Sequence, residues 1–515
     1  MKKMKGLFRI IFGRTAFVVL FLLIQIGFLF SCVRWLSGYL VYVYGGMIAL
    51  TVLVVVHILN ENVNPSFKIA WMVPVLVIPV FGTLLYLFVQ MQIGTKIIAA
   101  RLKVTAEETA PYLKQEETAA DALRNESQGM TNLAHYVKEY GGFPIYQGTS
   151  VEYFPLGDDM FPELKRQLSL AKHFIFMEYF IIERGVMWDE ILEILEQKAA
   201  EGVEVRVMYD GMCSMVLLPY RYPKLLEKKG IQCKMFSPIK PTLSTHQNNR
   251  DHRKICVIDG HTAFTGGVNL ADEYINQKLR FGHWKDTAVM LQGEAVRSFT
   301  MMFLQMWNIT ERRGEDYKQY LGNPQQVCLQ KAAGGFVMPY GDSPLDKENI
   351  GELVYIDILN QAKKYVHIMT PYLILDHEMV TALTFAAKRG VETIIIMPHI
   401  PDKKYAYMLA RSYYRELIEA GVQIYEYTPG FVHAKSFVSD DEKAVVGTIN
   451  LDFRSLYLHF ECGVLMYQNV AVQAVEQDFE ETLEKCCRIT LEDCRRYPFL
   501  KSFAGQLMRF VAPLM

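Results

Sequence analysis

The chain carries twice the same series of residues that could bind and transfer an anionic group. In each copy a histidine is followed two positions later by a lysine, and then by an aspartate, a pair of small residues and an asparagine. The first copy consists of His252, Lys254, Asp259, Gly266, Gly267 and Asn269, and the second of His433, Lys435, Asp440, Gly447, Thr448 and Asn450. Every residue meets its counterpart at one offset, because 433 − 252 and 450 − 269 both equal 181. Chance does not produce such a register, so the copies indicate a duplicated site.

These residue types indicate nucleophilic or acid–base chemistry on an anionic group. Residues two apart on a strand point to the same face, so each histidine should stand beside its lysine. The lysine cation and the asparagine amide can both donate to an anionic oxygen. Each aspartate lies where a hairpin turn should lead into a second strand, at 262–264 and 443–446. That strand would return the small residues and the asparagine toward the histidine, where glycines let backbone N–H groups approach an anionic oxygen.

Two further acids, Asp286 and Glu461, each precede an apolar strand in corresponding parts of the chain. A carboxylate at this place could accept a hydrogen bond from a catalytic histidine and hold its ring in one tautomer. The alternative is an ordinary acid at the entry of a strand. Glu178, at the edge of an earlier strand, is left out of the predicted site. The candidate catalytic residues are therefore His252, Lys254, His433, Lys435, Asn269, Asn450, Asp286 and Glu461.

The elements that must position these residues form an internal repeat, in which 142–322 can be laid over 335–488. Both halves alternate helix-like stretches with apolar, β-rich runs, which is typical of βαβ units with a buried sheet. The offset between the halves falls from 421 − 230 = 191 to 181, so the first half holds ten extra residues, predicted as a loop around 241–250. The repeat predicts an α/β fold of two tandem domains related by pseudo-twofold symmetry.

The doubled His-x-Lys-x-x-x-x-Asp pattern resembles the signature of the phospholipase D superfamily over about 142–488. This resemblance implies double displacement: one histidine attacks phosphorus to give a phosphatidyl-imidazole, and the other protonates the leaving alkoxide and deprotonates the incoming alcohol. By the resemblance His252 is the nucleophile and His433 the acid/base, although the symmetry of the sequence leaves this open. Asp259 and Asp440 would support the fold, and neither a metal nor another cofactor is expected.

The composition restricts the partners and allows several domains. Because 54 Lys and Arg balance 55 Asp and Glu, no bulk field attracts nucleic acid, and nine cysteines without zinc-type spacing are predicted to be reduced thiols. The 515 residues can fill more than one core. We expect a membrane anchor at 1–95, a helical connector at 96–140, a first phospholipase D-like domain at 141–325, and a second with a C-terminal helix at 326–515.

Three long apolar runs, at 15–33, 39–59 and 68–90, dominate the N-terminal part. Each is long enough to cross a bilayer, which takes about 20 residues, so we expect two or three transmembrane or interfacial helices. Basic residues at both ends of this segment indicate an even number of crossings, so either one run is re-entrant or interfacial, or one flank breaks the positive-inside rule. The catalytic domains are expected to be cytoplasmic. The segment 499–514 could lie on the membrane as an amphipathic helix or pack against the second domain.

The segments 69–82, 266–274 and 450–455 resemble bacterial cardiolipin synthases in particular. The resemblance implies a multi-pass enzyme of the bacterial inner membrane that joins two phosphatidylglycerol molecules into cardiolipin and releases glycerol. Its partners would be phosphatidylglycerol and bilayer lipid, without nucleic acid. The alternative is a phospholipase D or phosphatidylserine synthase that uses the same site with water or serine as acceptor. A catalytically dead scaffold is disfavoured because both motifs are intact, and the oligomeric state stays open.

Overall fold

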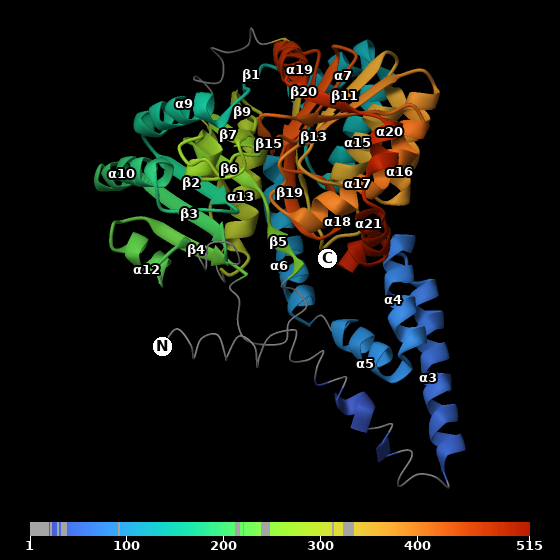
Figure 1. The fold of residues 1–515 in the computed structure, drawn as a ribbon. Coiled ribbons are helices and arrows are strands. Elements are labelled where there is room, and N and C mark those ends of the chain that lie inside the picture. The colour runs from blue at the N-terminus through green and yellow to red at the C-terminus, as the bar shows by residue number, and fades with distance from the viewer. Residues whose placement is uncertain are drawn as a thin grey trace. The chain divides into compact units, whose positions relative to one another are not determined.

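The computed structural model describes residues 20, 23–27, 30–31, 39–90, 93–211, 217–219, 221–237, 248–311, 314–322 and 334–514. The apolar run predicted at 15–33 and the loop predicted around 241–250 lie largely outside these residues. The described residues divide into two compact units, one with the residues up to 98, residue 248 and the residues from 507 on, the other with 99–237 and 249–506. Figure 1 labels the elements of both units.

In the first unit, helices α3 (Leu40–Asn60), α4 (Pro65–Val77) and α5 (Pro79–Gln90) pack against one another. Helix α4 begins where the Asn64 side chain accepts a hydrogen bond from the N–H of Ser66 at 2.9 Å, and the proline at its first position needs no donor. The buried contacts between the helices involve Val54, Ile58, Val75 and Tyr86. The unit therefore has a small apolar core of its own.

The apolar run at 68–90 is divided between two helices, because α4 ends at Val77 and α5 begins at Pro79. Proline has no N–H and its ring clashes with the carbonyl of the preceding turn, so it favours a helix start. Gly82 allows the close return of the chain, since a Cβ there would lie 2.1 Å from the carbonyl oxygen of Pro74. By length and composition, one helical stretch among the described residues, Pro79–Tyr112, could cross a membrane; the apolar helices Gly45–Asn60 and Pro65–Val77 are shorter.

The segment predicted as a helical connector is helical. It contains α6 (Ile93–Thr109), a 3-10 turn (Ala110–Tyr112), α7 (Glu117–Glu126), α8 (Gln128–Tyr136) and a π-helical turn (Val137–Gly141). The Gln115 side chain donates to the carbonyl of Ile145 at 2.9 Å and accepts from its N–H at 3.0 Å. This two-way amide contact ties the end of the connector to the chain that enters the first domain.

The first domain is built on a seven-stranded sheet with the order β1-β9-β7-β6-β2-β3-β4. Its strands are β1 (Ser150–Phe154), β2 (Phe174–Tyr179), β3 (Glu204–Asp210), β4 (Gln232–Phe236), β6 (Lys254–Ile258), β7 (Thr262–Gly266) and β9 (Ala288–Gln292). Its helices include α9 (Gly157–Leu170), α10 (Val186–Ala200), α12 (Tyr222–Glu227) and α13 (Val296–Asn308). Strand β2 is buried at every residue because helices cover both faces of the sheet.

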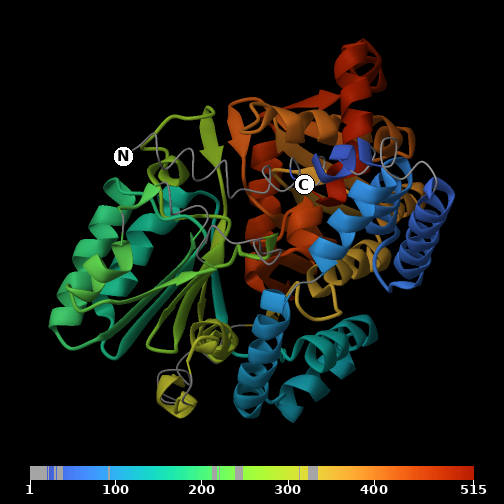
Figure 2. The same cartoon turned by 90° about the horizontal axis from the view of Figure 1, so that it is seen from below.

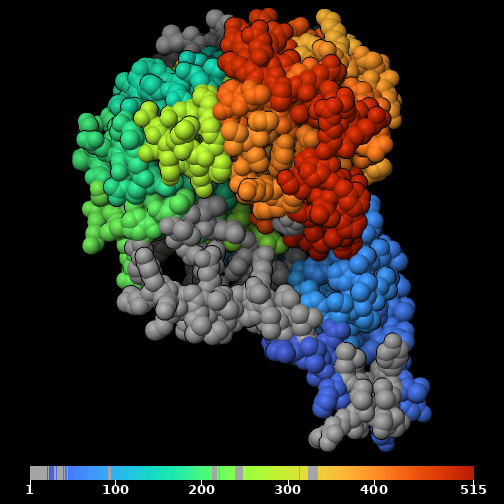
Figure 3. All heavy atoms as spheres, viewed as in Figure 1, coloured from blue at the N-terminus to red at the C-terminus, as the bar shows by residue number. Residues whose placement is uncertain are grey.

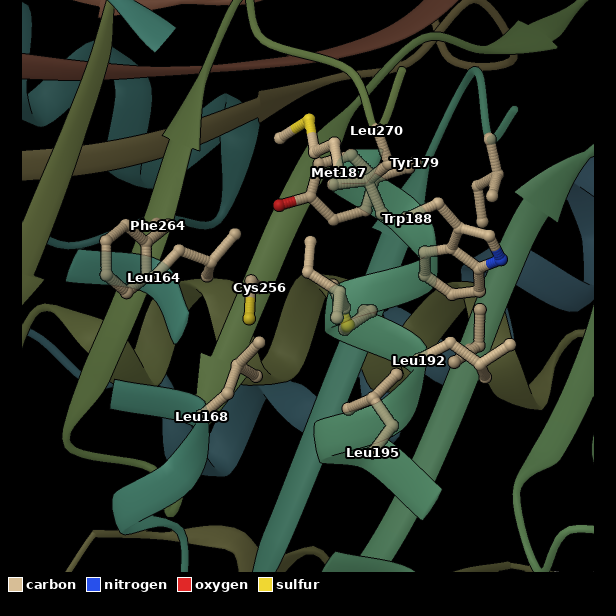
Figure 4. Close-up of a cluster of buried hydrophobic side chains, with 14 of the residues drawn as sticks. Leu164, Leu168, Tyr179, Met187, Trp188, Leu192, Leu195, Cys256, Phe264 and Leu270 are labelled. Atoms are coloured by element: carbon tan, nitrogen blue, oxygen red, sulfur yellow. The ribbon is translucent and has the colours of Figure 1, made fainter. Parts of the chain in front are cut away.

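Figure 4 shows one of these covered faces. Leucines 164 and 168 of α9 and Trp188 of α10 lie over the strands, where they meet Tyr179 and Phe264. The Trp188 ring also donates from Nε1 to the Tyr222 hydroxyl at 2.6 Å, which satisfies its polar atom in the core. On the other face α13 packs through Phe303, whose ring stacks on Phe176 at 4.7 Å between centroids.

The second domain repeats this strand order as β10-β19-β17-β16-β11-β13-β14 and adds β20 at the edge. Its strands are β10 (Phe336–Asp342), β11 (Tyr365–Met369), β13 (Glu392–Pro398), β14 (Gln423–Tyr427), β16 (Ser436–Ser439), β17 (Lys443–Gly447), β19 (His459–Tyr467) and β20 (Cys486–Ile489). Its helices are α15 (Ile350–Gln361), α16 (His377–Lys388), α17 (Lys404–Glu419), α18 (Phe453–Tyr457), α19 (Val470–Leu483), α20 (Leu491–Arg496) and α21 (Phe499–Val511). The prediction of two similar α/β domains is confirmed.

The two domains lie side by side, as Figures 1 and 2 show for the green and orange-to-red ribbons, and their atoms are in contact in Figure 3. Each domain contributes one short strand that pairs with a strand of the other domain. Strand β5 (Arg250–Asp251) pairs with β19, and β15 (Gly430–Val432) pairs with β8 (His283–Lys285). Across the same boundary the Lys285 ammonium donates to both oxygens of Asp478, at 2.6 and 2.7 Å. Both exchanged strands run directly into the motif histidines.

Candidate active site

Each motif histidine lies in a gap between two strands. His252 separates β5 from β6, and His433 separates β15 from β16. The backbone N–H of His252 donates to the carbonyl of Phe460 at 3.0 Å, and that of His433 donates to the carbonyl of Lys285 at 2.6 Å. The prediction of an uninterrupted strand through each histidine and lysine is therefore wrong. The chain leaves its own sheet there because it pairs with the other domain.

The two additional acids bond to the histidines of the opposite domain. The Nδ1 atom of His252 lies 2.9 and 3.0 Å from the two carboxylate oxygens of Glu461. The Nδ1 atom of His433 lies 2.5 Å from Oδ2 of Asp286. An ionised carboxylate is an acceptor, so Nδ1 carries the proton and Nε2 of each ring keeps its lone pair. Both histidine–acid pairs are buried and each needs both domains.

The two lysines are almost fully buried at the same place. Lys254 donates to the carbonyl of its own histidine, His252, at 2.6 Å, and Lys435 donates to the carbonyl of His433. Lys435 also lies 2.8 Å from Nδ1 of His433, but that nitrogen uses its proton for Asp286 and cannot accept from the lysine as well. Burial lowers the pKa of Lys435 to about 7, although Asp286 opposes this and Lys254 adds to it. Since charges from both domains act on this one lysine, the two motifs lie close together.

Burial also sets the protonation of the histidines. It lowers the pKa of His433 to about 4, with a further contribution from Lys435 and an opposing one from Asp286. It holds the pKa of His252 well below the ordinary value, although Glu461 opposes the shift. Both rings are therefore neutral near pH 7, and each presents an unprotonated Nε2. No hydrogen bond within the described part of the chain occupies either of these nitrogens.

The small residues after each motif make room for the acids. A Cβ on Gly267 would lie 1.9 Å from a carboxylate oxygen of Asp286. At the corresponding position, the Thr448 hydroxyl donates to the Glu461 carboxylate. The expectation that backbone N–H groups here face an anion is not met, because Gly267 donates to the carbonyl of Thr287 at 2.9 Å and Thr448 to that of Cys462 at 2.9 Å. These groups complete the contact between neighbouring strands.

The remaining small residues have no room for a side chain. Gly266 has φ of 149°, and a Cβ there would lie 2.3 Å from the carbonyl oxygen of Thr287. A Cβ on Gly447 would lie 2.4 Å from the carbonyl oxygen of Cys462. Both glycines therefore allow the strand that carries the acid to approach the strand that returns from the motif.

The two asparagines differ in their contacts. Asn269 accepts from the N–H of Ile181 at 3.0 Å and donates to the Tyr274 hydroxyl at 2.8 Å. The Tyr274 ring meets the ring of His433 edge-on, with centroids 5.4 Å apart. Asn450 is buried, and its Oδ1 has no hydrogen-bond partner among the described residues. Asn269 is thus held by the protein, whereas Asn450 has an unsatisfied amide oxygen.

The motif aspartates lie away from the histidines, at the hairpin turns. Asp259 follows β6 and accepts backbone N–H bonds of 2.7 to 2.9 Å from three successive residues at the start of β2. Asp440 follows β16 and accepts three equivalent bonds of 2.8 to 3.0 Å at the start of β11. The hairpins predicted after both aspartates are confirmed by the pairing of β6 with β7 and of β16 with β17. The carboxylates link each hairpin to the neighbouring strand.

Sequence reasoning missed a buried ionic group next to His252. The Arg253 guanidinium lies 2.6 Å from the Glu178 carboxylate and 3.3 Å from that of Asp251. All three side chains are buried, and burial holds the pKa of Glu178 well above the ordinary value although Arg253 opposes this. The available signal was the charge of Glu178 within the otherwise apolar strand β2. This group braces the backbone on both sides of His252.

Sequence reasoning also missed a third imidazole. His459 is buried, and its ring centroid lies 5.4 Å from that of His252. The corresponding residue of the first domain is Trp284, since 459 − 284 and 461 − 286 both equal 175. The Trp284 ring lies 5.4 Å from the ring of His433. Alignment of the two acids would have identified this aromatic position, two residues before each.

Metal binding can be assessed from the clusters of potential ligands. Among the described residues, two groups could hold an ion: His252, His459 and Glu461, and His399, Glu426 and Cys487. The expectation that the reaction needs no metal or other cofactor stays a prediction.

Two duplicated α/β domains that bring together two histidine–acid pairs and two buried lysines define a phosphoryl-transfer protein of the phospholipase D type. The family described as "Cardiolipin synthase, PLD-like domain" matches residues 164–307 and 355–483, and "Phospholipase_D-nuclease N-terminal" matches 49–90. The "Cardiolipin synthase" of Halalkalibacterium halodurans is 32% identical over 97% of this chain and 99% of that protein. That of Alkalihalophilus pseudofirmus is 33% identical over 97% and 98%. The chain therefore belongs to the bacterial cardiolipin synthase family of the phospholipase D superfamily.

Two other relatives extend the comparison. An uncharacterized protein of Streptococcus mutans is 52% identical over 90% of this chain and 99% of its own length. The crystal structure of phosphatidylserine synthase from Haemophilus influenzae aligns with a TM-score of 0.53 at 15% identity and covers 71% of this chain and 93% of that one. At that identity the likeness concerns the fold alone.

Proposed function

We propose that the protein is a cardiolipin synthase, a phosphatidyltransferase that joins two phosphatidylglycerol molecules and releases glycerol. The observation that carries the proposal is the exchanged pairing of His252 with Glu461 and of His433 with Asp286. It supplies two neutral imidazoles, each oriented by an acid, beside two lysines that can stabilise a phosphate. Relatives of nearly the same length that carry the name cardiolipin synthase support the choice of substrate.

In the first half-reaction, Nε2 of His252 attacks the phosphorus of one phosphatidylglycerol. An N–P bond forms, the P–O bond to the glycerol head group breaks, and the departing oxygen takes the proton of protonated His433. The lowered pKa keeps His433 neutral near pH 7, but an anionic phosphodiester favours its charged form and should raise its pKa on binding. Asp286 then stabilises the imidazolium, as an acid does in a histidine–acid pair.

In the second half-reaction, a glycerol hydroxyl of another phosphatidylglycerol gives its proton to Nε2 of His433. Its oxygen attacks phosphorus, the N–P bond breaks, and cardiolipin leaves with His252 restored. The ammonium groups of Lys254 and Lys435 stabilise the negative charge on the non-bridging phosphate oxygens in both steps. One phosphodiester replaces another, so the exchange is close to neutral in free energy, whereas hydrolysis would waste the intermediate. Burial of both histidines supports exclusion of water.

The proposed location is the bacterial inner membrane, with the anchor at 1–95 crossing or entering the bilayer and both catalytic domains in the cytoplasm. Helix α3 supports this, because its 21 residues include no Asp, Glu, Lys or Arg. Many of its large apolar side chains are exposed, such as Val41 at 81% and Leu53 at 67%. The break between α4 and α5 supports a re-entrant segment. Protease treatment of spheroplasts and of inverted vesicles should digest the catalytic domains only in the inverted vesicles.

The activity is tested with the purified full chain in vesicles of phosphatidylglycerol. Cardiolipin and glycerol should appear in equal amounts, and neither should form with His252→Ala or His433→Ala, whereas the exposed control His377→Ala should be active. Phosphatidic acid as the sole lipid product would instead indicate a phospholipase D. Phosphatidylserine formed in preference to cardiolipin when serine is added would indicate a phosphatidylserine synthase.

The roles of the histidines are tested by trapping the intermediate. Rapid quenching with labelled phosphatidylglycerol, followed by digestion in alkali and mass spectrometry, should place the phosphoryl group on the His252 peptide. Label on the His433 peptide would reverse the two roles without affecting the proposed activity.

A further inference from the structure

His459 is a buried imidazole without the hydrogen bonds that a buried polar group normally makes. It is 8% exposed, and neither ring nitrogen has a hydrogen-bond partner among the described residues. Its Nδ1 lies 3.7 Å from Oε1 of Glu461, which is too long for a hydrogen bond. A buried nitrogen without a hydrogen bond destabilises the folded protein by about 1–3 kcal/mol. A ligand that binds to this nitrogen would remove that penalty.

The residue that corresponds to His459 in the first domain is Trp284, which cannot bind a metal. Trp284 occupies the equivalent place beside His433, and indole cannot ligate a metal through its N–H. Asp286 therefore has one imidazole beside it, that of His433, whereas two imidazoles, those of His252 and His459, lie beside Glu461. The pocket is symmetric in its catalytic pairs and asymmetric in its metal-binding capacity.

We propose that His252, His459 and Glu461 form a binding site for one zinc ion, and that occupation of this site reversibly inhibits the enzyme. The three ligand atoms lie within 4.8 Å of one another. The Glu461 carboxylate is already 2.9 Å from Nδ1 of His252 and 3.7 Å from Nδ1 of His459. Ligand atoms of a tetrahedral zinc site stand about 3.4 Å apart, which small side-chain rotations would achieve.

The donor set selects the metal. Two imidazoles and one carboxylate suit zinc, with water in the fourth position, and suit magnesium or calcium poorly because those ions prefer oxygen ligands. The Lys254 ammonium donates to the backbone of His252 and repels a dication. We therefore expect a site that zinc fills and a chelator empties.

Inhibition follows whichever nitrogen of His252 binds the ion. If Nε2 is the ligand, the lone pair that attacks phosphorus is occupied. If Nδ1 is the ligand, its proton moves to Nε2 and the contact with Glu461 is lost. Neither arrangement leaves a nucleophile at Nε2 of His252.

The second cluster, His399, Glu426 and Cys487, is a weaker candidate. The Glu426 carboxylate already accepts from Tyr407 at 2.7 Å and from Arg411 at 3.3 Å. A metal there would have to displace these donors. This cluster offers a matched control, because His399→Asn removes a ligand outside the catalytic pocket.

The test uses the full chain in detergent, stripped with a chelator, and zinc alone as the probe. Zinc bound per chain is measured by elemental analysis after gel filtration, and its affinity by competition with a fluorescent chelator. Loss of an outer-shell partner lowers metal affinity by about 10–100-fold, so loss of a ligand in His459→Asn should lower it by about 100-fold or more. His399→Asn should keep the tight site, and circular dichroism checks that both variants are folded.

A second experiment measures cardiolipin formation by each variant with and without zinc. This experiment rests on the proposed function. Zinc should inhibit cardiolipin formation by the wild type and by His399→Asn, the chelator should restore it, and His459→Asn should be insensitive at the same zinc concentration. Equal zinc affinity of the wild type and His459→Asn would overturn the proposal. Absence of cardiolipin from the stripped wild type would contradict the proposed function but leave the binding measurement valid.

Discussion

Replacing Lys435 by arginine should change the pH dependence of catalysis. Lys435 is buried beside His433, and burial lowers its pKa to about 7, far below the ordinary 10.5. Its positive charge is therefore lost as the pH rises through about 7, and with it part of the attraction for the phosphate of the lipid. Arginine, with a pKa above about 12, keeps its charge throughout this range.

The size of the effect follows from the two protonation states. With a pKa of about 7, roughly 10/11 of the lysine is charged at pH 6 and roughly 1/11 at pH 8. The charged fraction thus falls about tenfold, while that of arginine stays constant. If binding requires the charge, the ratio of kcat/KM for Lys435→Arg to that of the wild type should rise about tenfold between pH 6 and pH 8.

The assay measures cardiolipin formation in mixed micelles of phosphatidylglycerol across this pH range. A ratio is used because groups common to both enzymes cancel, so low absolute activity of the variant does not matter. Lys443→Arg is the matched control, since Lys443 is buried with a lowered pKa but bonds to Gln361 outside the pocket. A ratio for Lys435→Arg that is as flat as the control would refute the argument that burial of this lysine sets the alkaline limit of activity.

Asp286→Asn should lower kcat by about a thousandfold or more without loss of thermal stability. The amide can no longer fix the tautomer of His433 or stabilise its imidazolium form. A kcat near that of the wild type would contradict the role of the His433–Asp286 pair. Gly267→Ala should be inactive or unfolded, as seen by enzyme assay and circular dichroism, since its Cβ would lie 1.9 Å from the Asp286 carboxylate. Burial, with Asp376 adding, raises the pKa of Glu352 to about 9, so the contribution of Glu352 to the stability of the fold is fully present below pH 4.5 and is lost as the pH rises toward 9. Glu352→Gln should therefore unfold at a higher temperature than the wild type at pH 8 and not at pH 4; parallel melting curves at both pH values would exclude this.

The repeated motifs, the hairpins after Asp259 and Asp440, and the duplicated order of strands could be predicted from the sequence. Each depends on relations over a few residues, such as a turn between two short strands or an apolar run behind a helix. A repeat also makes a motif easier to recognise, because the residues that recur in register in the second copy are the ones that form the motif. The break of the third apolar run at Pro79 follows the same local rules, because proline favours the start of a helix.

The partner of each catalytic histidine was decided by the tertiary structure. Glu461 lies 209 residues from His252, and Asp286 lies 147 residues from His433. Spacing along the chain determines which side chains share a face, but it carries no information about which domain supplies the neighbour across a boundary. Packing of the two sheets makes that choice: it exchanges β5 and β15 and draws each histidine out of its own sheet. The same packing buries His459 beside His252, because two strands meet there that the sequence separates by more than two hundred residues.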